Sequence, residues 1–193
     1  MRKRPQQGRS RATVDAIVEA GAQVLAGNGW EAFNTNRVAQ VAGASVGTIY
    51  QYFPHKLALL DAIRNRHFEA VVAVVRAAAD NAKTLPERIE ALVGGMIEVH
   101  GSRPSFHRAV LDDAPRASRT IAADDSLEHA YFAGYERLIA LGAECDHEAR
   151  STMSARVLSS AVEGVIHDAA RRGELMSSTF RHELKALVNR YLG

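Results

Sequence analysis

Apolar residues recur at three- and four-residue steps along most of the chain, which is the spacing of one face of an α-helix. A first helix is predicted from residue 11 to the Gly27-Asn28-Gly29 stop, and two short helices are predicted within residues 35–52. Longer helices are predicted over residues 56–80, 86–101, 103–113, 116–141, 147–172 and 179–192. No segment shows the two-residue alternation of a strand, so the pattern predicts an all-α fold.

The two short helices within residues 35–52 have the pattern of a helix-turn-helix. Gly43 stands where the chain must turn sharply, because glycine accepts a left-handed backbone. Ser45 is placed to cap the next helix through its hydroxyl. Ala39 supplies the small residue that two closely crossing helices need, and Ile49 fills the angle between them. An ordinary helical hairpin on the protein surface remains the alternative.

The second short helix has an outward face without an acidic residue, which suits a phosphate backbone. That face is formed by Gly47, Thr48, Tyr50, Gln51 and Tyr52. Lys56 follows Pro54 at the start of the next helix, where an ammonium group and a helix N-terminus together favour phosphate.

The segment AGASVGTIYQYFPHKLALL, residues 42–60, resembles the signature of the TetR family of transcriptional regulators. Ala44 and Ile49 depart conservatively from the usual Val and Leu of that signature. The upstream segment GNGWEAFNTNRVA also matches the family's Gly-aromatic turn and Thr-led second helix. The specific match covers about residues 13–62, and the rest of the chain matches only in length and helical character.

This resemblance implies an N-terminal three-helix DNA-binding domain followed by a larger helical domain for effector binding and dimerisation. We expect a flexible basic arm at 1–10, the helix-turn-helix domain at 11–56 and the larger domain at 57–193. The resemblance implies a homodimer through the last two helices, 147–172 and 179–192, reading a pseudo-palindromic double-stranded DNA operator. Those helices can instead bury their apolar faces in the same chain. Because most members of this family are repressors, the resemblance also implies that the protein represses transcription.

The expected DNA contacts divide by role. Thr48 and the backbone of Ser45–Gly47 are expected at base edges, Tyr50, Tyr52 and Lys56 at phosphates, and Gln51 at either. The resemblance adds the start of the first short helix, where Thr35 is also expected to act as the cap. The full set of expected DNA-binding residues is Thr35, Asn36, Arg37, Ser45, Val46, Gly47, Thr48, Tyr50, Gln51, Tyr52 and Lys56.

Charge is unevenly distributed between the two ends of the chain. Residues 1–66 hold 9 Lys and Arg against 4 Asp and Glu, whereas residues 67–193 hold 15 against 18. This asymmetry suits nucleic acid at the N-terminal end, although an excess this small also arises from ordinary scatter.

Other function classes find no support in the sequence. The one cysteine excludes an internal disulfide and a cysteine-based zinc cluster. The aliphatic run near residues 70–75 is too short to span a bilayer, and the basic start precedes no signal-peptide core, so a soluble cytoplasmic protein is expected. No H-E-x-x-H, G-x-S-x-G or glycine-rich phosphate loop occurs. We therefore expect no enzyme, no cofactor and no metal.

The larger domain is expected to bind a small hydrophobic or amphipathic effector, because its helices are apolar and poor in aromatic residues. Gly94-Gly95 indicates a close backbone approach, room for a ligand, or a simple helix crossing. Candidate polar groups of a pocket are Arg103, His107, His129, Tyr131, Tyr135 and His167. The alternative is a DNA-binding regulator or architectural protein that has no small-molecule sensor and is controlled by a protein partner.

Overall fold

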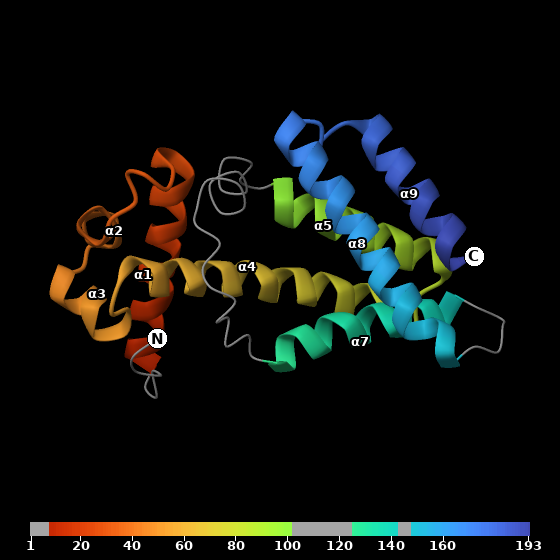
Figure 1. Cartoon of the computed structure of the whole chain (residues 1–193), viewed down its shortest axis with the longest axis horizontal. Coiled ribbons are helices and arrows are strands. Elements are labelled where there is room, and N and C mark those ends of the chain that lie inside the picture. Colours follow the sequence, from red (N-terminus) through yellow and green to blue (C-terminus); the bar gives the residue numbers. More distant parts are fainter. Residues whose placement is uncertain (1–7, 102–124, 143–147) are drawn as a thin grey trace. The chain divides into compact units, whose positions relative to one another are not determined.

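The computed structural model describes residues 8–101, 125–142 and 148–193, and within these ranges every regular element is an α-helix (Figure 1). The all-α prediction is therefore confirmed for the described part of the chain. The elements are α1 (Gly8–Asn28), α2 (Thr35–Ala42), α3 (Val46–Tyr52), α4 (Lys56–Ala78), α5 (Leu85–Gly101), α7 (Asp125–Gly142), α8 (Glu148–Arg172) and α9 (Ser178–Leu192).

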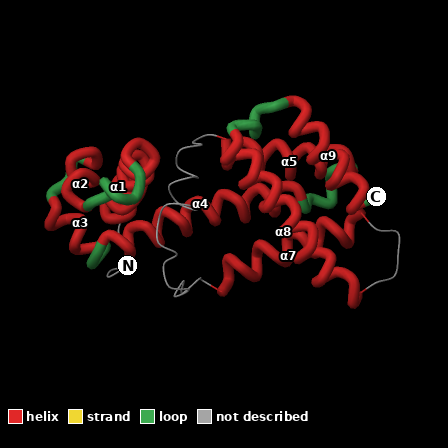
Figure 2. The backbone as a smooth tube through the Cα atoms, turned by 45° about the horizontal axis from the view of Figure 1, so that its top comes forward, coloured by secondary structure: helices red, strands yellow, loops and turns green. Residues whose placement is uncertain are grey.

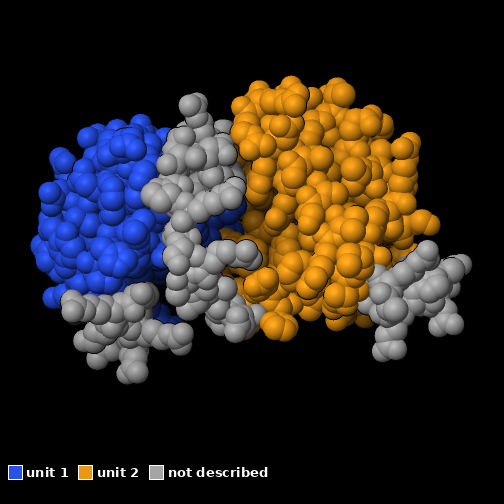
Figure 3. Space-filling model, in the orientation of Figure 1, with its two compact units in different colours: residues 1–67, 103–121 blue, residues 68–102, 122–193 orange. Residues whose placement is uncertain are grey.

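The chain divides into two compact units, coloured separately in Figure 3. Unit 1 comprises Met1–His67 with Arg103–Ile121, and unit 2 comprises Phe68–Ser102 with Ala122–Gly193. Helix α4 begins in unit 1 and ends in unit 2. The expected domain limits, 1–10, 11–56 and 57–193, stay a prediction. Residues 1–7 of the expected arm and the predicted helix over 103–113 lie outside the described residues.

Unit 1 has a core made by α1, α2, α3 and the first turns of α4. Gly21 on α1 permits close packing of α4, because a Cβ there would come within 2.9 Å of the Ile63 side chain. The fully buried side chains that fill this core include Ile17, Leu25, Phe33, Ile49, Phe53, Leu59 and Leu60.

Unit 2 packs the second half of α4 with α5, α7, α8 and α9 (Figure 2). A Cβ at Gly95 would come within 2.7 Å of Val74, and a Cβ at Gly134 within 2.6 Å of Val75. Gly95 therefore marks a close approach of α5 to α4. Of the three interpretations of Gly94-Gly95, the structure supports the close backbone approach. The core side chains include Leu92, Met96, Tyr135, Leu158, Val162, Ile166 and Val188.

Ionic contacts join α5 to α9 on the surface of unit 2. The Glu90 carboxylate pairs with the Lys185 ammonium and, at 3.1 Å, with the Arg181 guanidinium. These partners lower the pKa of the Glu90 carboxyl, chiefly through the hydrogen bond from Lys185. Among the described residues, no helix is long and apolar enough to cross a membrane, and no group of three or more potential ligands is placed to hold a metal ion.

Candidate nucleic-acid interface

The start of α2 is capped by Asn34, which corrects the expectation that Thr35 is the cap. Asn34 has an extended backbone, and its side-chain oxygen accepts the Arg37 N–H at 2.9 Å. Thr35 is instead the first helical residue and is buried, with its hydroxyl oxygen 3.3 Å from that of Tyr50. The correction has a local cause, since asparagine is as good a cap as threonine or better, and it precedes Thr35.

The turn between α2 and α3 agrees with the prediction from sequence. Gly43 has φ 63° and ψ 29°, the left-handed conformation that ends a helix. The Ala44 N–H donates to the Ala39 carbonyl at 3.0 Å, which satisfies the last turn of α2. Ala39 is buried and Ile49 is fully buried, as the helix crossing requires.

Ser45 caps α3, as predicted, and also engages Thr48. The Ser45 hydroxyl accepts the Thr48 N–H at 3.0 Å, and the two side-chain oxygens lie 2.8 Å apart. One hydroxyl donates to the other, so the Thr48 hydroxyl keeps only part of its capacity for a base edge. This pairing fixes the direction of the Thr48 side chain.

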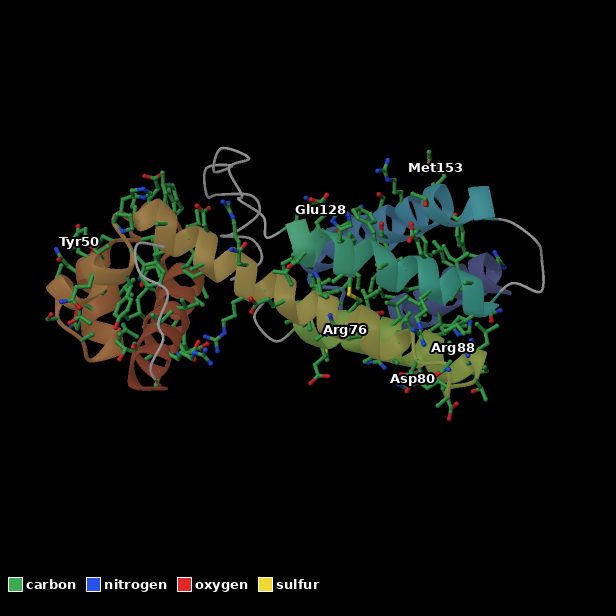
Figure 4. The ribbon with its side chains drawn as sticks, turned by 90° about the horizontal axis from the view of Figure 1, so that it is seen from below. Tyr50, Arg76, Asp80, Arg88, Glu128 and Met153 are labelled. Atoms are coloured by element: carbon green, nitrogen blue, oxygen red, sulfur yellow. The ribbon has the colours of Figure 1, made fainter. Side chains whose placement is uncertain are left out.

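The predicted DNA-binding residues come together on unit 1 but differ in accessibility. Thr35 is buried. Its link to this surface is the hydrogen bond between its hydroxyl and that of Tyr50. Half-buried members are Val46, Thr48, Tyr52 and Lys56, and exposed members are Asn36, Arg37, Ser45, Gly47, Tyr50 and Gln51. Figure 4 shows Tyr50 at the surface. The Thr35–Tyr50 contact links the start of α2 to α3, and neither helix contains an acidic residue.

Two residues beside this surface were not assigned to it from sequence. The Lys56 ammonium lies 4.2 Å from the centre of the Trp30 ring. The His55 Nδ1 accepts the Ala58 N–H at 3.1 Å and so caps α4. A little further along α4, burial raises the pKa of the Asp61 carboxyl, against the opposing charge of Arg64. The sequence did not assign Trp30 to this surface, because its contact with Lys56 spans the whole helix-turn-helix.

Of the candidate effector residues, the structure brings only Tyr131 and Tyr135 together among those that it describes. Arg103 and His107 lie outside the described residues, and His129 is exposed on α7. His167 is half-buried, with its ring 5.4 Å from that of the buried His100, which was not on the predicted set.

Tyr131 and Tyr135 form one buried polar pair in unit 2. Their rings pack edge to face at 5.1 Å, and the Tyr131 hydroxyl donates to the Glu163 carboxylate at 2.7 Å. The Tyr135 hydroxyl is buried, and within the described part of the chain no residue lies at hydrogen-bonding geometry to it. Burial raises the pKa of both phenols, so both stay protonated and able to donate. Glu163 was missed from sequence because it lies on another helix.

Helices α8 and α9 present an apolar groove of about 530 Å³ on unit 2. Phe180, Leu187 and Tyr191 line it together with the edges of Asp168 and Arg190. Further large apolar side chains are exposed on α8, at Met153 and Val157. This is the face from which a dimer was predicted.

Two family models match the chain. The model described as "Bacterial regulatory proteins, tetR family" matches residues 6–63, and "Tetracyclin repressor-like, C-terminal domain" matches residues 84–192. Among curated proteins, the HTH-type transcriptional repressor KstR of Mycolicibacterium smegmatis is 36% identical over 94 residues, covering 49% of this chain and 46% of that protein. KstR of Mycobacterium tuberculosis is 29% identical over 131 residues, covering 65% and 58%. The chain thus spans about half the length of the curated relatives it matches.

Solved structures share the fold at low identity. The fatty acid degradation regulator FadR of Bacillus halodurans superposes with a TM-score of 0.72 at 18% identity, covering 93% of this chain and 97% of that one. FadR of Bacillus subtilis, solved in complex with stearoyl-CoA, gives 0.73 at 12% identity, covering 93% and 97%.

Proposed function

Because the chain belongs to the tetR family of bacterial regulatory proteins, we propose that it regulates transcription by binding duplex DNA through α2 and α3. The observation that carries this proposal is the Ser45-capped α3, whose exposed face has no carboxylate and is joined to the start of α2 by Tyr50 and Thr35. Thr48 and the backbone of Ser45–Gly47 would meet base edges. Tyr50, Tyr52 and Lys56 would meet phosphates.

The proposal includes a homodimer formed by α8 and α9. A two-fold dimer carries two recognition helices, which read a pseudo-palindrome with half-sites spaced by whole helical turns. The exposed Val157, Leu187 and Tyr191 supply apolar area that a second copy would cover.

The proposal also includes a hydrophobic or amphipathic effector bound in unit 2, which releases DNA by favouring another conformer. Helix α4, which carries residues of both units, is the element that would transmit this change. An effector shifts the equilibrium only by its difference in affinity for the two conformers, typically about 1–3 kcal/mol. The stearoyl-CoA bound to B. subtilis FadR is such an amphipathic molecule and supports this class. Tyr131 and Tyr135 are the described candidates with buried polar groups.

Selection of bound sequences from random duplex DNA tests the proposal and yields the operator. We expect a pseudo-palindrome, with affinity that falls steeply as salt rises. Failure to retain any duplex at modest ionic strength would refute the DNA-binding function. Thr48→Ala should change the preference between operators, and Lys56→Ala should weaken binding to all sequences and flatten the salt slope by about one unit. The alternative of control by a protein partner predicts normal DNA binding and no response to any amphipathic compound.

A further inference from the structure

Trp30 makes a contact with Lys56, one of the residues at which a DNA phosphate contact is proposed. The Lys56 ammonium sits 4.2 Å from the centre of the Trp30 ring, well within the distance at which a cation is attracted to an aromatic face. Among the described residues, no carboxylate forms an ion pair with Lys56, so its charge is not neutralised there.

Trp30 is itself held firmly. Trp30 is 8% exposed, and its ring stacks on Phe33, with centroids 5.6 Å apart and planes 24° from parallel. The Phe33 N–H also donates to the Trp30 carbonyl at 3.1 Å, and Asn34 follows as the cap of α2. The ring is therefore a rigid surface at the entrance to α2, whereas Lys56 is the first residue of α4.

A lysine side chain that is free in solution must lose rotamer freedom when it contacts a phosphate, and this loss weakens binding. A ring that already holds the ammonium removes part of that loss. It occupies one side of the ammonium and leaves the remaining N–H groups to donate outward. Tryptophan gives the strongest attraction of the aromatic residues.

We propose that Trp30 is a positioning residue for DNA binding, whose ring holds the Lys56 ammonium in place for a backbone phosphate. This inference rests on the proposed function. It adds a role to a residue that otherwise serves only the packing of unit 1.

The chain contains one tryptophan, which permits a test without any change of sequence. Biosynthetic replacement by mono-, di- and trifluorinated tryptophans alters only this ring, withdrawing electron density from its face with little change in shape. We expect affinity for the selected operator to fall stepwise by about 2- to 5-fold across the series. The salt slope should move toward that of Lys56→Gln, by at most about one unit. Circular dichroism should show folded protein throughout at the assay temperature.

The same fluorinated series in Lys56→Gln is the control, and there we expect no dependence of affinity on fluorination. An unchanged affinity across the wild-type series would overturn the inference. Equal losses in Lys56→Gln would also overturn it, since they would show that the ring acts only through packing. Both results differ from failure of the proposed function, in which the unlabelled protein binds no duplex.

Discussion

The buried guanidinium of Arg88 on α5 donates to the carbonyl oxygen of Leu141 at the end of α7, over 2.8 Å. Its Nε also donates to the carbonyl of Asp80, just after α4, at 3.1 Å. Figure 4 labels Arg88 and Asp80 in this part of unit 2. One side chain thus satisfies a backbone carbonyl in the last turn of α7 and another just after α4, where helix ends leave carbonyls without intrahelical partners.

Arg88→Met should lower the free energy of unfolding by about 2–3 kcal/mol, because two carbonyls lose charge-assisted hydrogen bonds. Urea denaturation measures this change. Arg76→Met is the matched control on α4, since Arg76 is exposed and its replacement should change stability by less than about 0.5 kcal/mol. Equal effects of the two substitutions would show that the hydrogen bonds of Arg88 do not stabilise the fold.

Substitutions of Ser45 should separate stability from DNA binding. Ser45→Ala removes the cap of α3 and should cost about 1 kcal/mol of stability. Ser45→Asp keeps a capping oxygen, so it should retain stability, but its negative charge should repel phosphates and abolish operator binding. Thermal denaturation and a mobility-shift assay measure the two properties. Normal DNA binding by Ser45→Asp would place this helix end away from DNA.

Tyr135→Phe should stabilise the protein by about 1 kcal/mol, because it removes a buried hydroxyl to which none of the described residues offers a hydrogen bond. Tyr131→Phe should have the opposite sign and a similar size, since it removes the bond to Glu163. Thermal unfolding without ligand compares the two variants. A loss of stability in Tyr135→Phe would mean that its hydroxyl is hydrogen-bonded in solution.

Stability should fall at alkaline pH because of the same two tyrosines. Burial, reinforced by the Glu163 charge, raises the pKa of both phenols above their ordinary 10.0. Above that value the unfolded chain releases phenolic protons that the folded chain retains, so rising pH favours unfolding. The expected slope approaches about 1.4 kcal/mol per pH unit for each phenol. Urea denaturation from about pH 8 to about pH 11.5 measures it. The double variant Tyr131→Phe, Tyr135→Phe should lose most of this slope; an unchanged slope would assign it to other groups.

Leu187→Glu should convert the proposed dimer to monomers, because it places a charge in the groove between α8 and α9. Sedimentation velocity should show this shift, together with a large loss of affinity for a full operator. Ala73→Glu, an exposed position on α4, is the control and should leave the association state unchanged. A wild-type protein that sediments as a monomer would refute the dimer itself.

The helices and the helix-turn-helix could be read from sequence because their signals act over a few residues. Gly43 ends α2 through its own backbone, and Ser45 caps a peptide N–H three residues away. The error at the cap of α2 arose because two adjacent residues are both good caps. The first helix also begins earlier than predicted, at Gly8 rather than residue 11.

Sequence alone thus determined the helix identities, the turn at Gly43 and the cap at Ser45, since each depends on neighbours within about one helical turn. Only the tertiary structure decided that Lys56 rests on Trp30, that Arg88 reaches Leu141, and that Tyr131 meets Glu163. The last two pairs are separated by 53 and 32 residues. No local pattern records which distant side chains meet, because that depends on how the helices pack.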